Sequence, residues 1–242
     1  MEVVSRVVDA DQVVEFAVED VESRMKWVRL SLLGRLFMES PPSLSLIQKI
    51  VNGAWECALK VKVLEAEMGL LQFFFGSKSD INRVLQRTPW PVKDHVLHLQ
   101  PWQPVTHELV DSFIHVSFWV QMWGIPTHCR TSAFGKRMAE AKLGEVVDVG
   151  AYAVKGNPNH FIKAKTKING YEPLCSQLFA SNPVVGEFWV RLIYEFLPMY
   201  CYHCGRLGHM GKHCKFTAPT RIEHYGPGLS TNIAGHRVEE RF

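Results

Sequence analysis

A short segment rich in cysteine and histidine constrains this chain more than any other feature. Three cysteines and one histidine stand in it at the spacing C-x2-C-x4-H-x4-C, namely Cys201, Cys204, His209 and Cys214. Three thiolates and one imidazole can close a tetrahedral site around one structural Zn²⁺, with no open position for water. A segment this short cannot bury a core, so we expect metal ligation to supply most of its folding free energy, about 10 to 16 kcal/mol in zinc-finger peptides. Without metal it should be disordered.

The remaining residues of this segment suggest what it binds. Gly205 and Gly208 fall where the chain must turn tightly, which glycine allows without a Cβ penalty. Tyr202 and Met210 have no core to enter, so we expect them to form an apolar platform for an unpaired base. The segment resembles the zinc knuckle of retroviral nucleocapsid proteins, which grips single-stranded nucleic acid at these two positions. The alternative is a structural or protein-binding knuckle.

Local charge favours nucleic acid. No Asp or Glu lies between Glu195 and Glu223, whereas this run contains Arg206, Lys212 and Lys215. Each phosphate that such residues neutralise releases counterions, which favours binding. The alternative is a solvated tail.

Composition describes a folded chain of modest positive charge. Of its 242 residues, 47% are hydrophobic and 21% are charged, and the formal net charge is +3, which permits nucleic acid without requiring it. The cysteines outside the knuckle are scattered, and we interpret them as ordinary thiols: Cys57, Cys129 and Cys175. The first residues are acidic, unlike a secretory signal, and no apolar run approaches the roughly 20 residues of a membrane span. We expect a nuclear or cytoplasmic protein that is neither secreted nor bound to a membrane.

After an acidic arm at residues 1–24, residues 25–104 predict a ferredoxin-like α+β domain. Strands are expected at 27–37, 59–67, 70–75 and 95–99, and helices at 43–55 and 80–86. The order strand, helix, strand, strand, helix, strand is also that of RNA-recognition domains. Phe74 should face away from Phe73 and Phe75. We expect it either to be a stacking platform on the open sheet face or, more commonly for such a residue, to pack against a neighbouring domain.

Residues 116–198 predict a second, partial α+β unit. Strands are expected at 118–123, 145–152, 160–168 and 187–196 and a helix at 131–143, with an irregular stretch at 173–183 in place of a second helix. Lys163, Lys165 and Lys167 alternate along one strand and should share one face. Such a row either contacts phosphates or is solvated and guards a sheet edge. The zinc knuckle follows at 199–216, and a disordered tail is expected at 217–242.

An ordered set of motifs spans roughly Trp27 to Cys214. It consists of Gln72-Phe73-Phe74-Phe75, Asp80, Arg83-Val84-Leu85, Pro89-Trp90, Val96-Leu97, Trp102, Phe118-Trp119-Val120-Gln121, Gly124-Ile125-Pro126 and Tyr194-Glu195-Phe196-Leu197-Pro198. In this order the motifs resemble plant proteins of retrotransposon origin that carry a domain of unknown function ahead of a CCHC knuckle. Thr88 departs from the small residue, usually glycine, found there. The resemblance implies a nucleic-acid-binding protein related to the first reading frame of non-LTR retrotransposons, acting as an RNA or single-strand packaging factor. The chain stops soon after the knuckle, so we expect no reverse transcriptase or nuclease in it.

Two functions therefore stand as hypotheses. The sequence contains no nucleophile elbow, phosphate-binding glycine loop or paired-carboxylate motif, so we expect no enzyme. The first hypothesis is a zinc-dependent protein that binds single-stranded RNA or DNA. The second is a protein-interaction or dimerisation module, forming homo-oligomers, in which the zinc knuckle is only structural.

Overall fold

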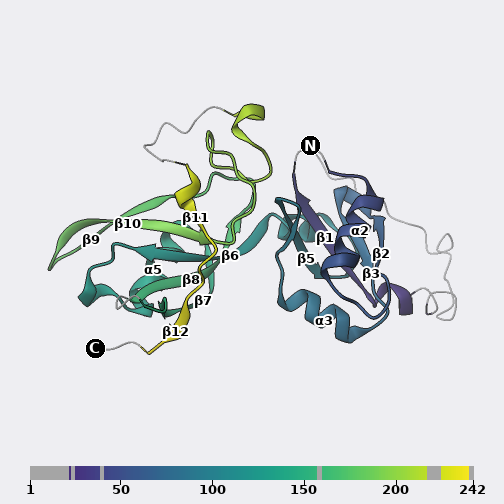
Figure 1. Ribbon diagram of the computed structural model, residues 1–242, viewed down its shortest axis with the longest axis horizontal. Coiled ribbons are helices and arrows are strands. Elements are labelled where there is room, and N and C mark those ends of the chain that lie inside the picture. Colours follow the sequence, from purple (N-terminus) through teal and green to yellow (C-terminus); the bar gives the residue numbers. More distant parts are fainter. Residues whose placement is uncertain (1–21, 23–24, 39–40, 157–159, 217–224, 240–242) are drawn as a thin grey trace, which may run out of the picture.

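Two antiparallel sheets organise the protein, which is an α+β structure (Figure 1). The computed structural model describes residues 22, 25–38, 41–156, 160–216 and 225–239. The expected acidic arm, apart from Glu22, lies outside these residues. The first sheet has the strand order β2 (Lys62–Glu65), β3 (Leu71–Phe74), β1 (Ser31–Phe37), β5 (His95–Pro101) and β4 (Trp90–Val92). Its first strand starts at Ser31 rather than Trp27, because residues 25–28 are helical.

Helices cover both faces of the first sheet. One face packs against α2 (Leu44–Ala54) and α3 (Lys78–Gln86), whose amphipathic patterns predicted them, around Leu32 and Phe73. The 3-10 turn η2 (Glu67–Gly69) connects β2 to β3. The other face meets α4 (His107–Ser112), which no sequence pattern indicated, in a small cluster with Leu33. Phe73 is buried, whereas Phe74 on the opposite face is only half-buried.

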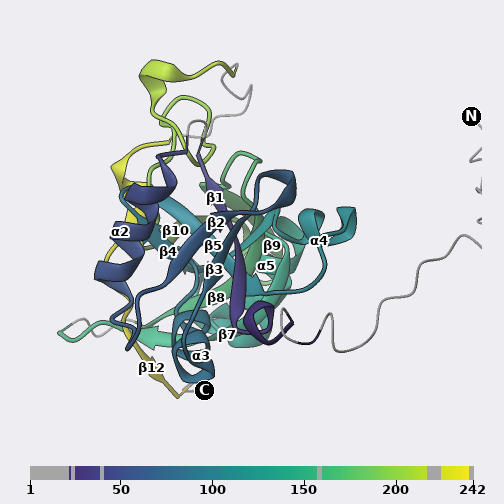
Figure 2. The same ribbon diagram turned by 90° about the vertical axis from the view of Figure 1, so that its right-hand side faces the viewer.

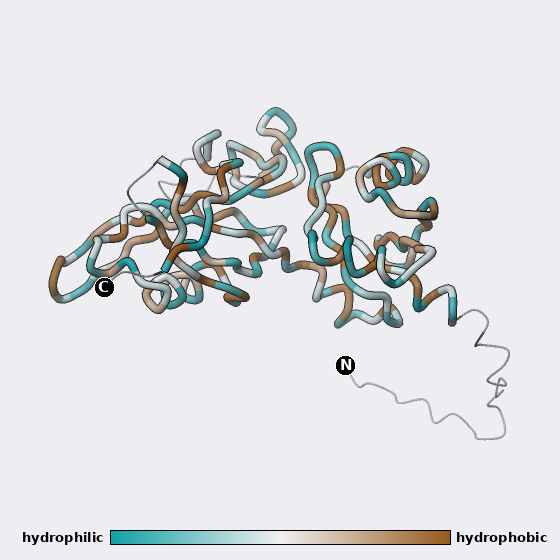
Figure 3. Tube along the Cα trace, turned by 60° about the horizontal axis from the view of Figure 1, so that its bottom comes forward, coloured by the Kyte–Doolittle hydropathy of each residue, from teal (hydrophilic) through white to brown (hydrophobic). Residues whose placement is uncertain are grey.

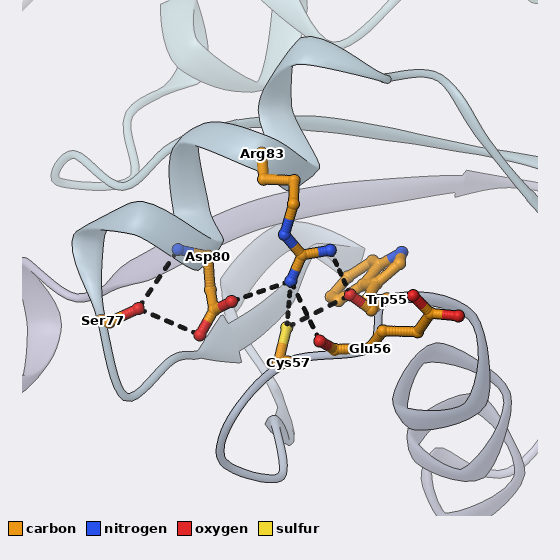
Figure 4. Close-up of polar contacts among 6 residues, drawn as sticks. All are labelled: Trp55, Glu56, Cys57, Ser77, Asp80 and Arg83. Atoms are coloured by element: carbon orange, nitrogen blue, oxygen red, sulfur yellow. Dashed lines mark hydrogen bonds and ion pairs between the residues drawn. The ribbon is translucent and has the colours of Figure 1, made fainter.

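A polar network joins α3 to the loop that ends α2 (Figure 4). Ser77 accepts a hydrogen bond from the backbone N–H of Asp80, which caps the helix. Arg83 donates to the Asp80 carboxylate at 2.8 Å and also to the carbonyls of Trp55 and Glu56. The bonds from Arg83 and Ser77 lower the pKa of Asp80 below its ordinary value. Asp80 and Arg83, two of the motif residues, therefore hold the fold together.

The second sheet repeats the strand order of the first. Its central strands run β10 (Gly186–Glu195), β6 (His115–Trp123), β8 (His160–Asn169) and β7 (Glu145–Ala153), as β5, β1, β3 and β2 do in the first sheet. Helix α5 (Ser132–Lys142) follows the 3-10 turn η3 (Thr127–Cys129) and packs on β7 and β8. It comes so close that a Cβ on Gly135 would overlap Ile162. The stretch expected to be irregular contains β9 (Gln177–Asn182), which forms a hairpin with β10.

The segment after the knuckle is folded, which corrects the expected disordered tail for residues 225–239. It contains the 3-10 turn η5 (Pro227–Leu229), then β11 (Ser230–Thr231), parallel to β10, and β12 (His236–Val238), antiparallel to β7. These two strands lie at opposite edges of the sheet. Between them the chain accepts hydrogen bonds at Ile233 from Gln121 and at Ala234 from Lys163. We call residues 230–238 the C-terminal strap, because they cross the sheet face opposite α5.

The first sheet with α2, α3 and α4 and the second sheet with α5 form two lobes, which share a packed junction. Phe37 and Val96 of the first sheet belong to the core of the second. A Cβ on Gly170 would overlap the Phe37 ring, so the two lobes meet closely. In two perpendicular views the knuckle segment sits over one end of this junction (Figures 1 and 2). Among the described residues, no helix is long and apolar enough to cross a membrane.

Candidate metal centre and nucleic-acid interface

The four cysteine and histidine residues of the knuckle converge on one point. Their donor atoms all lie within 4.8 Å of one another. A β-bridge between Tyr200 and Leu207 closes the first loop, and the N–H of Gly205 donates to the Cys201 carbonyl at 2.8 Å. The 3-10 turn η4 (Gly211–His213) then returns the chain to Cys214. Four donors from one short stretch of chain thus form one cluster.

The geometry of the cluster is compatible with a single metal ion. Sγ of Cys204 lies 3.4 Å from Nε2 of His209, whereas a tetrahedral metal with bonds near 2.3 and 2.05 Å would hold S and N about 3.6 Å apart. Cys201, Cys204 and His209 are buried and Cys214 is half-buried. The N–H of His203 donates to the Cys201 sulfur at 3.4 Å.

Burial and backbone dipoles act differently on two of these thiols. Burial raises the pKa of Cys204 to about 12. At Cys201 burial also opposes ionisation, but hydrogen bonds from the N–H groups of Cys204 and His203 and from the thiols of Cys214 and Cys204 together outweigh it, and the pKa falls. A metal cation would have to displace the Cys204 proton, so metal binding should release protons and weaken in acid.

The knuckle is docked on both lobes rather than held by a linker alone. The N–H of Met199 donates to the Asp94 carbonyl at 2.6 Å, and that of Leu174 donates to Gly205 at 3.0 Å. Gly208 has φ +89 and approaches the backbone of residues 37–38, and Gly205 has φ +75 and lies against the ring of Tyr225. We expected metal ligation to supply most of the folding free energy of this segment; its contacts with both lobes add a second source of stability.

Tyr202 and Met210 lie on the exposed side of the knuckle. Their exposed fractions are 54% and 46%. The ring of Tyr202 contacts that of Tyr200, with centroids 5.1 Å apart, and Tyr200 itself is buried. The two residues proposed as an apolar platform are therefore accessible, and the ring of Tyr202 packs on a buried neighbour.

The three basic residues of the knuckle have different surroundings. Arg206 is engaged within the fold, since it donates to the Tyr171 carbonyl, lies 3.4 Å from the Glu172 carboxylate and stacks over Phe216. Lys212 and Lys215 are exposed and form no ion pair with any other described residue. Among the described residues, therefore, Arg206 has an acidic partner, whereas Lys212 and Lys215 have none.

The lysine row of β8 does not present three free charges. Lys163 is buried, with 4% of its side chain exposed, and its ammonium group lies 2.9 Å from the carboxylate of Glu195. Lys167 pairs at 2.9 Å with Glu145 on β7, and Lys165 is half-buried opposite Trp119. The expectation that the row contacts phosphate does not fit Lys163, because the fold already uses its charge.

Lys163 instead lies at the centre of a buried polar network that sequence reasoning missed. Its ammonium group lies 4.1 Å from the ring centroid of Tyr152 and 4.6 Å from that of Trp119. Gln121 donates to Glu195 at 2.8 Å and accepts from the Trp123 indole. The available signal was a strand lysine with aromatic residues on the neighbouring strands. No sequence pattern predicted that the C-terminal strap would cover this lysine.

The sequence comparisons cover the first lobe. Residues 25–107 match a family described as a domain of unknown function (DUF4283). No curated protein matches the chain. The match agrees with the predicted resemblance in its domain of unknown function, and it ends before the second sheet and the metal-ligand cluster.

Proposed function

We propose that this protein binds single-stranded RNA or DNA through a zinc-dependent knuckle and is not an enzyme. One observation carries the proposal: beside four converging donors, the knuckle exposes Tyr202 and Met210 with two free lysines. Aromatic platforms stack on any base, and lysines hold the phosphates. The resemblance of the ordered motifs to plant retrotransposon-derived proteins supports the same function.

We propose zinc as the metal. Three sulfurs and one imidazole nitrogen suit Zn²⁺, and four protein ligands leave no position for a reacting water. The role of the metal would be structural: by fixing the four ligands it would hold Gly205 and Gly208, and with them the loop that exposes Tyr202, in one conformation. No disulfide joins the described cysteines, which fits a nuclear or cytoplasmic compartment.

We also infer a ferredoxin-like arrangement for the first lobe. The order β2-β3-β1-β5, with α2 and α3 on one face, supports it. The open-face position of Phe74 agrees with an RNA-recognition relationship, although α4 and the second lobe cover other parts of that face.

The test is a binding titration of the zinc-loaded protein against single-stranded RNA, single-stranded DNA and duplex. Tyr202→Ala should weaken single-strand binding by about 5- to 150-fold, which corresponds to roughly 1 to 3 kcal/mol per stacked base. Lys212→Ala should lower the salt dependence by about one counterion. Cys204→Ser and zinc removal by a chelator should both reduce binding.

Trp189→Ala is the matched control, because Trp189 is an equally exposed aromatic on the β9–β10 hairpin. It should bind as the unaltered protein does. Equal affinity of Tyr202→Ala, Cys204→Ser and the unaltered protein would refute the proposal.

One observation favours a second function, self-association. The β9–β10 hairpin exposes Phe179, Val184, Val185 and Trp189, and its tip is hydrophobic and projects from the second lobe (Figure 3). Apolar groups gathered on a surface are typical of interaction sites. In light scattering, a dimer that Val184→Asp converts to a monomer would support this function, and a strictly monomeric protein would exclude it.

A further inference from the structure

A groove opens beside the knuckle, where the β4–β5 turn, the end of β10, the knuckle and the C-terminal segment meet. It has a volume of about 750 Å³, within the roughly 300 to 1,000 Å³ of small-ligand pockets. Lys93 lines it from the β4–β5 turn, Phe196 from the end of β10, and Tyr202 and Met210 from the knuckle. The groove therefore continues the platform that the knuckle exposes.

Phe196 lies in this groove in an unfavourable state. Its φ is +52, a left-handed conformation that is a genuine outlier for a bulky residue. Its side chain is 61% exposed, so burial does not explain the strain. A bond from its N–H to the Thr231 carbonyl, at 2.8 Å, holds it there. Such strain concentrates at functional sites, where the surrounding structure imposes it.

Lys93 shares this backbone feature. Its φ is +53, and only four described non-glycine residues have a positive φ. Two of those four line the same groove. The contact between Met199 and the Asp94 carbonyl fixes the turn that carries Lys93 against the knuckle segment.

Charge around the groove suits an anion. A second groove of about 680 Å³ shares Met199 and Met210 with the first and is lined by Lys212 and Lys215. Apart from histidines, the charged residues that line the two grooves are three lysines and Asp94. A chain of phosphates that carries flat aromatic bases therefore matches this surface better than an acidic or a neutral peptide.

We propose that this groove holds a second nucleotide of the bound single strand, with its base stacked on Phe196 and its phosphate at Lys93. The inference rests on the proposed function and extends it, because the binding surface then spans the knuckle and the first lobe. The strand would run from Lys212 and Lys215, past Met210 and Tyr202, to Phe196.

The test uses the full zinc-loaded chain and labelled oligouridylate and oligothymidylate of about eight nucleotides. Phe196→Asn removes the ring and keeps a residue that tolerates positive φ, so the protein should stay as stable as before. Affinity should fall about fivefold or more, and Lys93→Ala should lower both the affinity and its salt dependence.

Met68→Asn is the matched control, since Met68 is also exposed with φ +57 but lies outside both grooves. It should leave affinity unchanged. If Phe196→Asn and Lys93→Ala bind normally while Tyr202→Ala is weakened, the second subsite is refuted and the knuckle function stands. If the unaltered protein binds no single strand, both proposals fail.

Discussion

The buried ion pair between Lys163 and Glu195 gives the sharpest test of the second lobe. Only 4% and 2% of the two side chains are exposed, and the pair is closed over by the C-terminal strap. Lys163→Met keeps an unbranched side chain only one heavy atom shorter but removes the charge. Glu195 then remains buried, with only the bond from Gln121 among its hydrogen bonds described above.

The structure supplies a built-in comparison for the magnitude. Removing one member of a buried pair leaves an uncompensated charge and costs about 3 to 5 kcal/mol. Lys167 is paired with Glu145 at the same distance of 2.9 Å, but its side chain is 44% exposed. Lys167→Met should therefore cost about 1 kcal/mol or less. Replacing both Lys163 and Glu195 with Met should cost less than Lys163→Met alone, since no charge is left unpaired.

Urea unfolding followed by circular dichroism measures these differences. Thiol labelling shows which lobe a substitution destabilises, because Cys129 belongs to the core of the second lobe and Cys57 packs on the core of the first. Lys163→Met should lower the melting temperature by about 6 °C or more. It should also increase the rate of thiol labelling more at Cys129 than at Cys57. A loss no larger than that of Lys167→Met would refute the assignment of Lys163 as a structural charge.

Two further predictions concern the knuckle and the first lobe. Gly205→Ala places a Cβ on the Tyr225 ring at φ +75, whereas the Cβ of Gly211→Ala would have no neighbour closer than 4.0 Å. In chelator competition, Gly205→Ala should weaken zinc affinity about tenfold or more, and Gly211→Ala should change it little. Equal effects of the two substitutions would contradict the docking of Tyr225. Burial lowers the pKa of His98 to about 4, below the unfolded value near 6.5, so the folded state binds fewer protons and stability should fall as the pH drops from about 6.5 towards 4. His98→Gln should reduce that acid sensitivity in urea midpoints measured at both ends of the range, and an unchanged pH dependence would argue against this source.

Local patterns were enough to predict the main elements of both lobes. The three-and-four spacing of apolar residues located α2 and α3, and apolar runs separated by turns located β2, β3, β7 and β8. The spacing of the four ligand residues likewise predicted their convergence. In each case the signal and the structure lie within one short stretch of chain.

Long-range contacts account for what the sequence could not predict. Nothing near Arg206 in the sequence indicates that Tyr171 and Glu172 engage it. The β8 lysines do alternate along the strand, but Lys163 is paired with Glu195, which lies 32 residues away in the sequence. Phe196 reads as one more apolar strand residue, because its positive φ depends on the strap beside it.

The path of the C-terminal strap also bears on how this protein acquires its structure. Gln121 meets Ile233 across 112 residues, and Lys163 meets Ala234 across 71. Contacts of such wide separation form slowly, since a long loop must close before they stabilise anything. On the ribosome, the second sheet can be completed only after the segment that follows the knuckle has been synthesised, and a fragment ending at residue 216 would lack that segment. The knuckle segment also contacts this downstream chain, since Gly205 lies against the ring of Tyr225 and the Tyr200 hydroxyl donates to the Gly226 carbonyl. Expressing the first 216 residues alone should therefore remove contacts from both the second sheet and the knuckle.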